Sequence, residues 1–193
     1  MSSDHTASLF SRRRFLKTAI LSGMGCASLF GGAYPATAAV LNSLEEGGRT
    51  LSFQNVHTGE VFSGEYKVGG RYLPDAFSEI NRVLRDFRTG DEYPMDPRVV
   101  DIMYTIHKKT GRATPFEILS GYRSPKTNQM LRKTSTGVAK NSFHMTGQAI
   151  DLRMPSFSTR EIRNIALALR AGGVGFYAGS DFVHIDTGQV RSW

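Results

Sequence analysis

Two short apolar segments near the C-terminus carry ionisable side chains where a buried strand normally carries apolar ones. The first, residues 149–153 (AIDLR), contains Asp151, and the second, residues 182–186 (FVHID), contains His184 and Asp186. Burying a carboxylate costs on the order of several kcal/mol unless the group is paired or coordinated. We therefore expect both segments to be strands that bring these groups to partners, and a fold that isolates them is excluded.

His144 supplies a third group of this kind. It lies seven residues before Asp151, with Gly147 between the two. Two imidazoles and one carboxylate from separate elements can occupy three corners of a tetrahedral zinc site, with the fourth left for water, as in catalytic zinc centres. The same residues can instead form a His–Asp ion pair between strands. The spacing alone leaves both interpretations of His144, Asp151 and His184 open.

The pattern of apolar residues along the chain predicts an α+β fold. Period-two alternation indicates strands, and apolar residues three and four apart indicate helices. Asp96 and Pro97 form a helix N-terminus, and Ser158 with Glu161 forms a capping box. We expect helices on one side of a mostly antiparallel sheet, with the site on its open side. The expected strands are 50–56, 61–62 with 65–68, 116–119, 149–153, 173–177 and 182–186. The expected helices are 74–88, one beginning at 97, 124–133 and 158–170.

The N-terminal part of the chain has the layout of an export signal. Residues 11–17 (SRRRFLK) are basic, an apolar stretch follows, and an A-x-A motif permits cleavage after residue 38. The pair Arg12 and Arg13 resembles the twin-arginine signal of bacteria, and the alternative is a general secretory signal with a chance arginine pair. We therefore expect a twin-arginine signal peptide over 1–38 and one folded domain over 39–193.

Composition narrows the partners of the folded domain. The single cysteine, Cys26, lies in the expected signal, so neither a disulfide nor a cysteine metal site is expected in residues 39–193. The net charge of +7 falls to +4 there, because residues 1–38 carry four basic side chains against one acid. A moderately basic surface favours binding to an anionic polymer. The sequence lacks the stripe of basic residues interleaved with aromatic ones that would indicate binding to nucleic acid. The sequence contains no uninterrupted run of 18 strongly apolar residues, so we expect no stable membrane span.

Three motifs make the chain similar to a known superfamily. Residues 142–151 (SFHMTGQAID) resemble the S-x-H-x-x-G-x-A-x-D signature of zinc peptidases that act on bacterial cell-wall peptides. That superfamily includes D-Ala-D-Ala dipeptidases and carboxypeptidases and shares its fold with the Hedgehog signalling domain. Residues 120–124 (SGYRS) resemble its S-G-[YF]-R-[ST] segment, and residues 181–184 (DFVH) its third-ligand segment. Within it, the chain resembles the murein endopeptidase K branch from about residue 51 to the end.

The resemblance implies roles for four residues. His144, Asp151 and His184 are implied as the ligands of one zinc ion. The same three residues are the candidate ligands identified above from the sequence pattern. Arg123 is implied as a substrate-binding residue. A guanidinium group presents a fixed fork of donors, which suits the carboxylates of a wall peptide or a developing oxyanion.

The general base is predicted to be Asp181, three residues before His184, where dipeptidases of the superfamily carry Glu. In a regular strand, positions 181 and 184 face opposite sides, so Asp181 needs a bend to reach the metal. Asp186 is the alternative, either as the base or as the partner of a ligand histidine. His57 lies in a turn, where we expect a structural hydrogen bond, and Trp193 is expected to serve packing rather than substrate stacking.

These features together predict a periplasmic, zinc-dependent endopeptidase that hydrolyses cross-links between peptidoglycan stem peptides. The expected partners are those stem peptides and, in transit, the twin-arginine export machinery. Two alternatives stay open. The chain can be a D,D- or L,D-carboxypeptidase or dipeptidase acting on free ends of wall peptides. It can also be a non-catalytic, zinc-holding wall-binding module, because Hedgehog-type domains show that such a site does not guarantee turnover.

Overall fold

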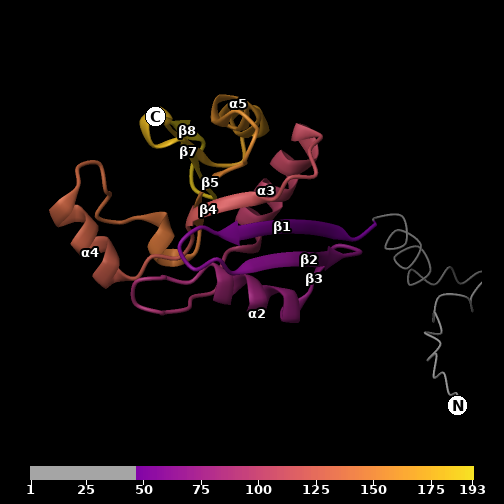
Figure 1. The fold of residues 1–193 in the computed structure, drawn as a ribbon, viewed down its shortest axis with the longest axis horizontal. Coiled ribbons are helices and arrows are strands. Elements are labelled where there is room, and N and C mark those ends of the chain that lie inside the picture. The colour runs from indigo at the N-terminus through magenta and orange to yellow at the C-terminus, as the bar shows by residue number, and fades with distance from the viewer. Residues whose placement is uncertain (1–46) are drawn as a thin grey trace, which may run out of the picture. The chain divides into compact units, whose positions relative to one another are not determined.

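An eight-stranded sheet organises residues 47–193, the part of the chain that the computed structural model describes (Figure 1). The strand order is β3-β2-β1-β4-β5-β7-β6-β8. Neighbouring strands are antiparallel except for the β1–β4 and β6–β8 pairs, which are parallel. The strands are β1 (Arg49–Asn55), β2 (Val61–Val68), β3 (Arg71–Tyr72), β4 (Phe116–Ser120), β5 (Ala149–Arg153), β6 (Gly173–Tyr177), β7 (Phe182–Asp186) and β8 (Arg191–Ser192). The predicted signal peptide, residues 1–38, lies outside the described residues.

The helices between residues 47 and 193 begin where the sequence supplies start signals. A proline occupies the first turn of α2, α3 and α4, where its missing N–H needs no partner. The side chains of Asp96 and Ser124 cap α3 and α4 by accepting backbone N–H groups. None of these helices is long and apolar enough to cross a membrane. The helices are α2 (Pro74–Val83), α3 (Pro97–Thr110), α4 (Pro125–Thr134) and α5 (Thr159–Leu169), with short 3₁₀ turns η1 (Phe143–Thr146) and η2 (Ala178–Ser180).

Alternation along β5 and β7 separates the core from the polar site. Ile150 and Leu152 on β5, and Val183 and Ile185 on β7, are buried in one apolar cluster with residues of α3 and α5. Burying each such side chain contributes roughly 1.5–3 kcal/mol. The intervening residues of these strands project from the opposite face of the sheet. The core therefore fixes both strands, and the residues between the core positions are held as a rigid polar surface.

One helix differs from the others in its surroundings. In Figure 1, α4 is set apart from α2, α3 and α5. Its buried residues are Thr127 and Asn128 rather than apolar side chains. The predicted placement of helices on one side of the sheet describes α2, α3 and α5, whereas the loop after α4, residues 136–139, borders the cavity described below.

The predicted strands and helices all occur, and β5, β6 and β7 have the predicted bounds. The end of the first helix was predicted wrongly, because α2 stops at Val83 instead of reaching residue 88. Its periodic apolar residues continue, but the chain turns at Asp86. The buried Asp86 carboxylate accepts the backbone N–H of Ser124 at 2.8 Å, which ties this loop to the start of α4.

The start of α5 was predicted at the correct residue, but the predicted side-chain capping was wrong. Ser158 is the N-cap residue, but its side chain makes no capping hydrogen bond. Instead, the backbone carbonyl of Ser158 accepts the N–H of Glu161 at 3.0 Å, so the predicted capping box does not form. The helix ends at Arg170, which adopts a left-handed conformation (φ +50°), a position that glycine more often fills.

Candidate metal centre

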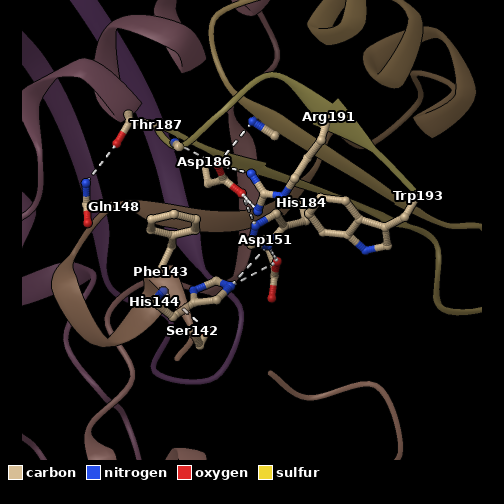
Figure 2. A network of polar contacts seen from close by, with 12 residues as sticks. Ser142, Phe143, His144, Gln148, Asp151, His184, Asp186, Thr187, Arg191 and Trp193 are labelled. Atoms are coloured by element: carbon tan, nitrogen blue, oxygen red, sulfur yellow. Dashed lines mark hydrogen bonds and ion pairs between the residues drawn. The ribbon is translucent and has the colours of Figure 1, made fainter. Parts of the chain in front are cut away.

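Two strands and a 3₁₀ turn bring three side chains to one point. Asp151 on β5 lies directly opposite His184 on β7, so both project from the same face. His144 reaches them from η1, and the three ligand atoms lie within 4.8 Å of one another. His184 Nδ1 is 2.8 Å from Asp151 Oδ1, and His144 Nε2 is 3.2 Å from His184 Nδ1 and 3.3 Å from Asp151 Oδ1 (Figure 2). The structure therefore brings together the three predicted metal ligands.

Two glycines allow the backbone to place His144. Gly147 ends η1 with φ +66°, and a side chain there would collide with the carbonyl oxygen of Pro94. Gly121 supplies the carbonyl oxygen that His144 Nδ1 contacts at 2.7 Å. A Cβ at Gly121 would lie 2.8 Å from Leu84 Cβ. Glycine at both positions thus permits the close backbone approach that orients His144.

In each histidine, the ring nitrogen that points away from the other two ligand residues, here called the outer nitrogen, makes a hydrogen bond. The Nδ1–H of His144 donates to the Gly121 carbonyl, which leaves Nε2 with a lone pair facing the centre. The Nε2–H of His184 donates to Asp186 Oδ2 at 3.1 Å, which leaves Nδ1 as its inward atom. Such outer partners fix the tautomer and ring orientation of metal-bound histidines. The arrangement directs two imidazole nitrogens and one carboxylate oxygen towards a common point.

Asp186 is fully buried, and both of its oxygens are occupied. Besides His184, it accepts N–H groups from Arg191 at 2.6 and 3.1 Å. The backbone N–H groups of Gly173 and Gly188 also donate to it, at 3.0 and 2.8 Å. Figure 2 shows this network behind the His184 ring. Of the two roles considered for Asp186, the geometry supports that of a partner for His184.

The electrostatics of the three inward groups differ. Burial lowers the pKa of His144, despite the nearby Asp151 carboxylate. Burial would also lower the pKa of His184, but its hydrogen bonds to the Asp151 and Asp186 carboxylates outweigh burial and raise the pKa to about 9. Burial would raise the pKa of Asp151, but the two imidazoles hold it well below its usual range. A carboxylate that stays ionised while buried provides the negative charge that a bound cation needs.

Arg123 lies beside this group, as predicted for a substrate-binding residue. One of its terminal nitrogens is 3.6 Å from Asp151 Oδ2. Its Nε is buried and has no hydrogen-bond partner within residues 47–193. A buried donor without an acceptor costs free energy, roughly 1–3 kcal/mol. Arg123 also helps to line the adjoining cavity of about 410 Å³, together with His144, Asp151 and His184.

The structure does not place the carboxylate of Asp181, the predicted general base, beside the three inward groups. The chain does bend after Ser180, and Asp181 adopts a left-handed conformation (φ +51°). That bend directs its carboxylate to the hydroxyl of Thr159, which donates to it at 2.8 Å. Asp181 lines a different cavity, together with Glu117 and Arg153. The described geometry therefore does not support proton transfer by Asp181.

His57 and Trp193 have different positions relative to the cavity. His57 stacks on Phe87, with ring centroids 3.8 Å apart, and its Nε2 lies 3.1 Å from the Leu119 carbonyl oxygen. It does not line the cavity, and these contacts match the expected structural role. Trp193 does line the cavity, with its ring centroid 5.3 Å from that of His184. Sequence reasoning missed Tyr177 as a lining residue, because only the pairing of β6 with β7 places it there.

The donor set fits a zinc ion. Zinc commonly takes imidazole nitrogens and carboxylate oxygens in tetrahedral geometry, and three protein ligands leave one position for water or substrate. His144, Asp151 and His184 supply such a set, and both histidines have the committed outer nitrogens that a ligand position requires. The same three residues line the cavity described above.

Comparisons with known proteins place the chain in a family. Residues 43–193 match a family model described as peptidoglycan L,D-endopeptidase MepK. A relative from Haemophilus influenzae, named probable peptidoglycan L,D-endopeptidase MepK, is 42% identical over 146 residues, which cover 75% of this chain and 78% of the relative. Peptidoglycan L,D-endopeptidase MepK of Escherichia coli K12 is 42% identical over 145 residues, covering 75% and 80%. No solved structure matched the chain.

Proposed function

The chain belongs to the family of peptidoglycan L,D-endopeptidases described as MepK, and from that premise we propose that it cleaves peptidoglycan cross-links with one zinc ion held by His144, Asp151 and His184. The family supports a hydrolase that acts on peptide bonds of peptidoglycan. The observation that supports the metal site is the convergence of two inward imidazole nitrogens and one carboxylate oxygen at the edge of a cavity.

The protein supplies a preorganised centre for this chemistry. Zinc, when bound there, lowers the pKa of a water molecule towards neutrality and polarises a carbonyl group. Asp186 and the Gly121 carbonyl hold the two imidazole rings in orientation, so that little rearrangement is needed on binding. The β5 and β7 backbones, fixed by the apolar core beneath them, keep Asp151 and His184 opposite each other.

Arg123 is proposed to bind the substrate. Its backbone N–H donates to the carbonyl of His144 at 3.1 Å, which couples the guanidinium to the position of a metal ligand. Its guanidinium group, which lines the cavity, can donate to a peptide carbonyl or to a carboxylate of the stem peptide. A donor aimed at an oxygen that gains negative charge during hydrolysis contributes most in the transition state.

The proton acceptor is the role with the least geometric support. Asp186 uses both oxygens in hydrogen bonds and is fully buried, so it is not available for proton transfer. The role of Asp181 stays a prediction, because its carboxylate would have to leave Thr159 and turn into the other cavity. Among residues 47–193, Asp151 is the one carboxylate that lines the cavity with the histidines.

We place the activity in the periplasm, after export through the twin-arginine pathway. The support is the arginine pair at Arg12 and Arg13, the A-x-A motif ending at residue 38, and a substrate that lies outside the cytoplasmic membrane. Replacing both arginines with lysine should leave precursor in the cytoplasm, as followed by cell fractionation. Normal export of that variant would exclude the twin-arginine route.

Purified residues 39–193 should be incubated with cross-linked muropeptides, with and without a chelator, and the products identified by mass. We expect the cross-link to be cleaved into its two peptide halves, loss of cleavage with the chelator, and recovery when zinc is added back. Removal of terminal residues alone would indicate a carboxypeptidase or dipeptidase instead. Stoichiometric zinc without any cleavage would indicate a wall-binding module.

A further inference from the structure

Tyr177 projects into the cavity beside the proposed metal centre. In the antiparallel pairing of β6 with β7, Gly175 lies opposite His184, and Tyr177 lies opposite Phe182. Residues two apart on a strand share a face, so Tyr177 is on the same face as His184. Its ring stacks on that of Phe182, with centroids 4.4 Å apart and planes at 15°. The strand pairing thus gives the Tyr177 ring a defined position.

Trp193 is held next to Tyr177 by its backbone. Its N–H donates to the Val174 carbonyl at 3.2 Å, and its carbonyl accepts the N–H of Phe176 at 3.0 Å. Its ring lies against Gly175, where a Cβ would come within 2.7 Å of the indole. The absence of a side chain at Gly175 therefore makes room for the indole, which Figure 2 shows beside His184.

The hydrogen bond between the two rings has a fixed direction. Trp193 Nε1 lies 2.9 Å from the Tyr177 hydroxyl oxygen. An indole nitrogen can only donate, so the tyrosine oxygen accepts and its own proton is left for another acceptor. Within residues 47–193, no acceptor for that proton is found. Tyr177, which lines the cavity together with Asp151 and His184, therefore keeps a hydroxyl proton that can be donated to a ligand.

We propose that Tyr177 binds substrate, donating a hydrogen bond to a carbonyl or carboxylate oxygen of the peptide next to the scissile bond, and that Trp193 is its positioning residue. The proposal rests on the proposed function, since the peptidoglycan peptide supplies the acceptor. The contact lies on the flank of the metal centre rather than at it. Its main effect is on substrate affinity and specificity, and metal binding does not depend on it.

Tyr177→Phe keeps the ring that stacks on Phe182 and removes only the hydroxyl. We expect kcat/KM for cross-linked muropeptides to fall roughly 5- to 50-fold, mainly through KM, with zinc content unchanged. Trp193→Phe should give a smaller fall in the same direction, and adding it to Tyr177→Phe should cause no further loss. Tyr104→Phe is the matched control, because Tyr104 lies on α3 and does not line the cavity.

Three results would overturn the proposal: an unchanged kcat/KM in Tyr177→Phe, an equal loss in Tyr104→Phe, or losses from Tyr177→Phe and Trp193→Phe that simply multiply. A wild-type chain that cleaves no muropeptide would overturn the proposed function instead. Normal wild-type turnover with no effect of Tyr177→Phe would leave the proposed function standing and remove only the tyrosine contact.

A second, independent feature is the charge of the chain around α4. Residues 118–150 contain no Asp or Glu and carry five basic side chains. Residues 47–193 hold 20 basic and 14 acidic residues, so this segment accounts for five of the six excess positive charges. The loop after α4 lines the proposed active-site cavity through residues 136–139 and Asn141. The five are Arg123, Lys126, Arg132, Lys133 and Lys140.

Four of these, here called the α4 basic surface, are exposed: Lys126, Arg132, Lys133 and Lys140. None of the ion pairs found within residues 47–193 involves them. Uncompensated charge of one sign beside a cavity raises the local concentration of oppositely charged ligands. We infer that the α4 basic surface binds anionic groups of peptidoglycan beyond the cleaved peptide, which again rests on the proposed function.

Replacing all four residues of the α4 basic surface with Gln should weaken co-sedimentation with purified sacculi roughly tenfold at low salt, with the difference disappearing at high salt. Cleavage of a small soluble muropeptide should stay unchanged. The control makes the same charge change elsewhere, at four exposed residues, Lys108, Lys109, Arg112 and Arg170. Equal weakening by the control, unchanged sacculus binding, or tighter wild-type binding to duplex DNA than to sacculi would each overturn the inference.

Discussion

Replacing Asp186 with Asn would test how far the buried carboxylate behind His184 sets metal affinity. Asp186 Oδ2 accepts both His184 Nε2–H at 3.1 Å and Arg191 at 2.6 Å, while Oδ1 accepts two backbone N–H groups. An Asn side chain replaces one of these acceptor oxygens with an NH₂ donor. Whichever way the amide is oriented, its NH₂ group faces donors, so hydrogen bonds are lost on one side.

The orientation of the amide decides the damage to the centre. If the NH₂ group faces His184, the imidazole must move its proton to Nδ1 or rotate, and either change removes the inward lone pair. Loss of an outer partner of a metal-bound histidine typically costs 10- to 100-fold in affinity. At about 1.4 kcal/mol per tenfold, the expected loss is roughly 1.4–2.8 kcal/mol of zinc binding.

Zinc affinity would be measured by competition with a chelating dye, on wild-type protein and on Asp186→Asn. Asp181→Asn is the control, because the same chemical change is made next to β7 but outside the metal cavity. Circular dichroism before and after zinc addition would show that both variants are folded. Affinity of Asp186→Asn within twofold of wild type would refute the reasoning that this carboxylate fixes the His184 tautomer.

Three further predictions concern other residues. His144→Ala leaves two protein ligands and should abolish stoichiometric zinc binding, and full zinc by metal analysis would contradict the site. Asp181→Asn tests the predicted general base: a fall in turnover of roughly 100- to 10,000-fold with zinc retained would support that role, and turnover within about threefold of wild type would exclude it. Burial would raise the pKa of Asp101, but hydrogen bonds from Tyr72 and other donors, including Lys67, lower it. The stabilisation that ionised Asp101 provides is therefore present above its unfolded-state pKa, about 3.9, and is lost as the pH falls through its lower folded-state pKa. Asp101→Asn should lower the free energy of unfolding at pH 7 by about 2–4 kcal/mol, as measured by urea denaturation.

The sequence identified the strands of the site because their patterns combine two independent signals. Apolar alternation set the bounds of β5 and β7, and the polar residues inside them required partners, which the register supplies by placing Asp151 opposite His184. The short β8 and its parallel pairing with β6 had no such signal. Two residues are too few to show a period, so the contact of Trp193 with Gly175 could be found only from the structure.

The two carboxylates near His184 show why a correct motif does not by itself assign roles. Spacing places Asp186 on the His184 face of a regular strand, and β7 is regular there, so the expected partnership follows from geometry alone. Asp181 lies before the strand, where the direction of its side chain depends on the backbone of one turn. A left-handed conformation at that residue turns the carboxylate to Thr159. Asp adopts that conformation more readily than most non-glycine residues, but whether it does so at one turn depends on the surrounding contacts, and a motif contains no information about those contacts. The positions within strands could therefore be predicted from the sequence, whereas the role of the turn residue depends on a conformation that the sequence pattern does not encode.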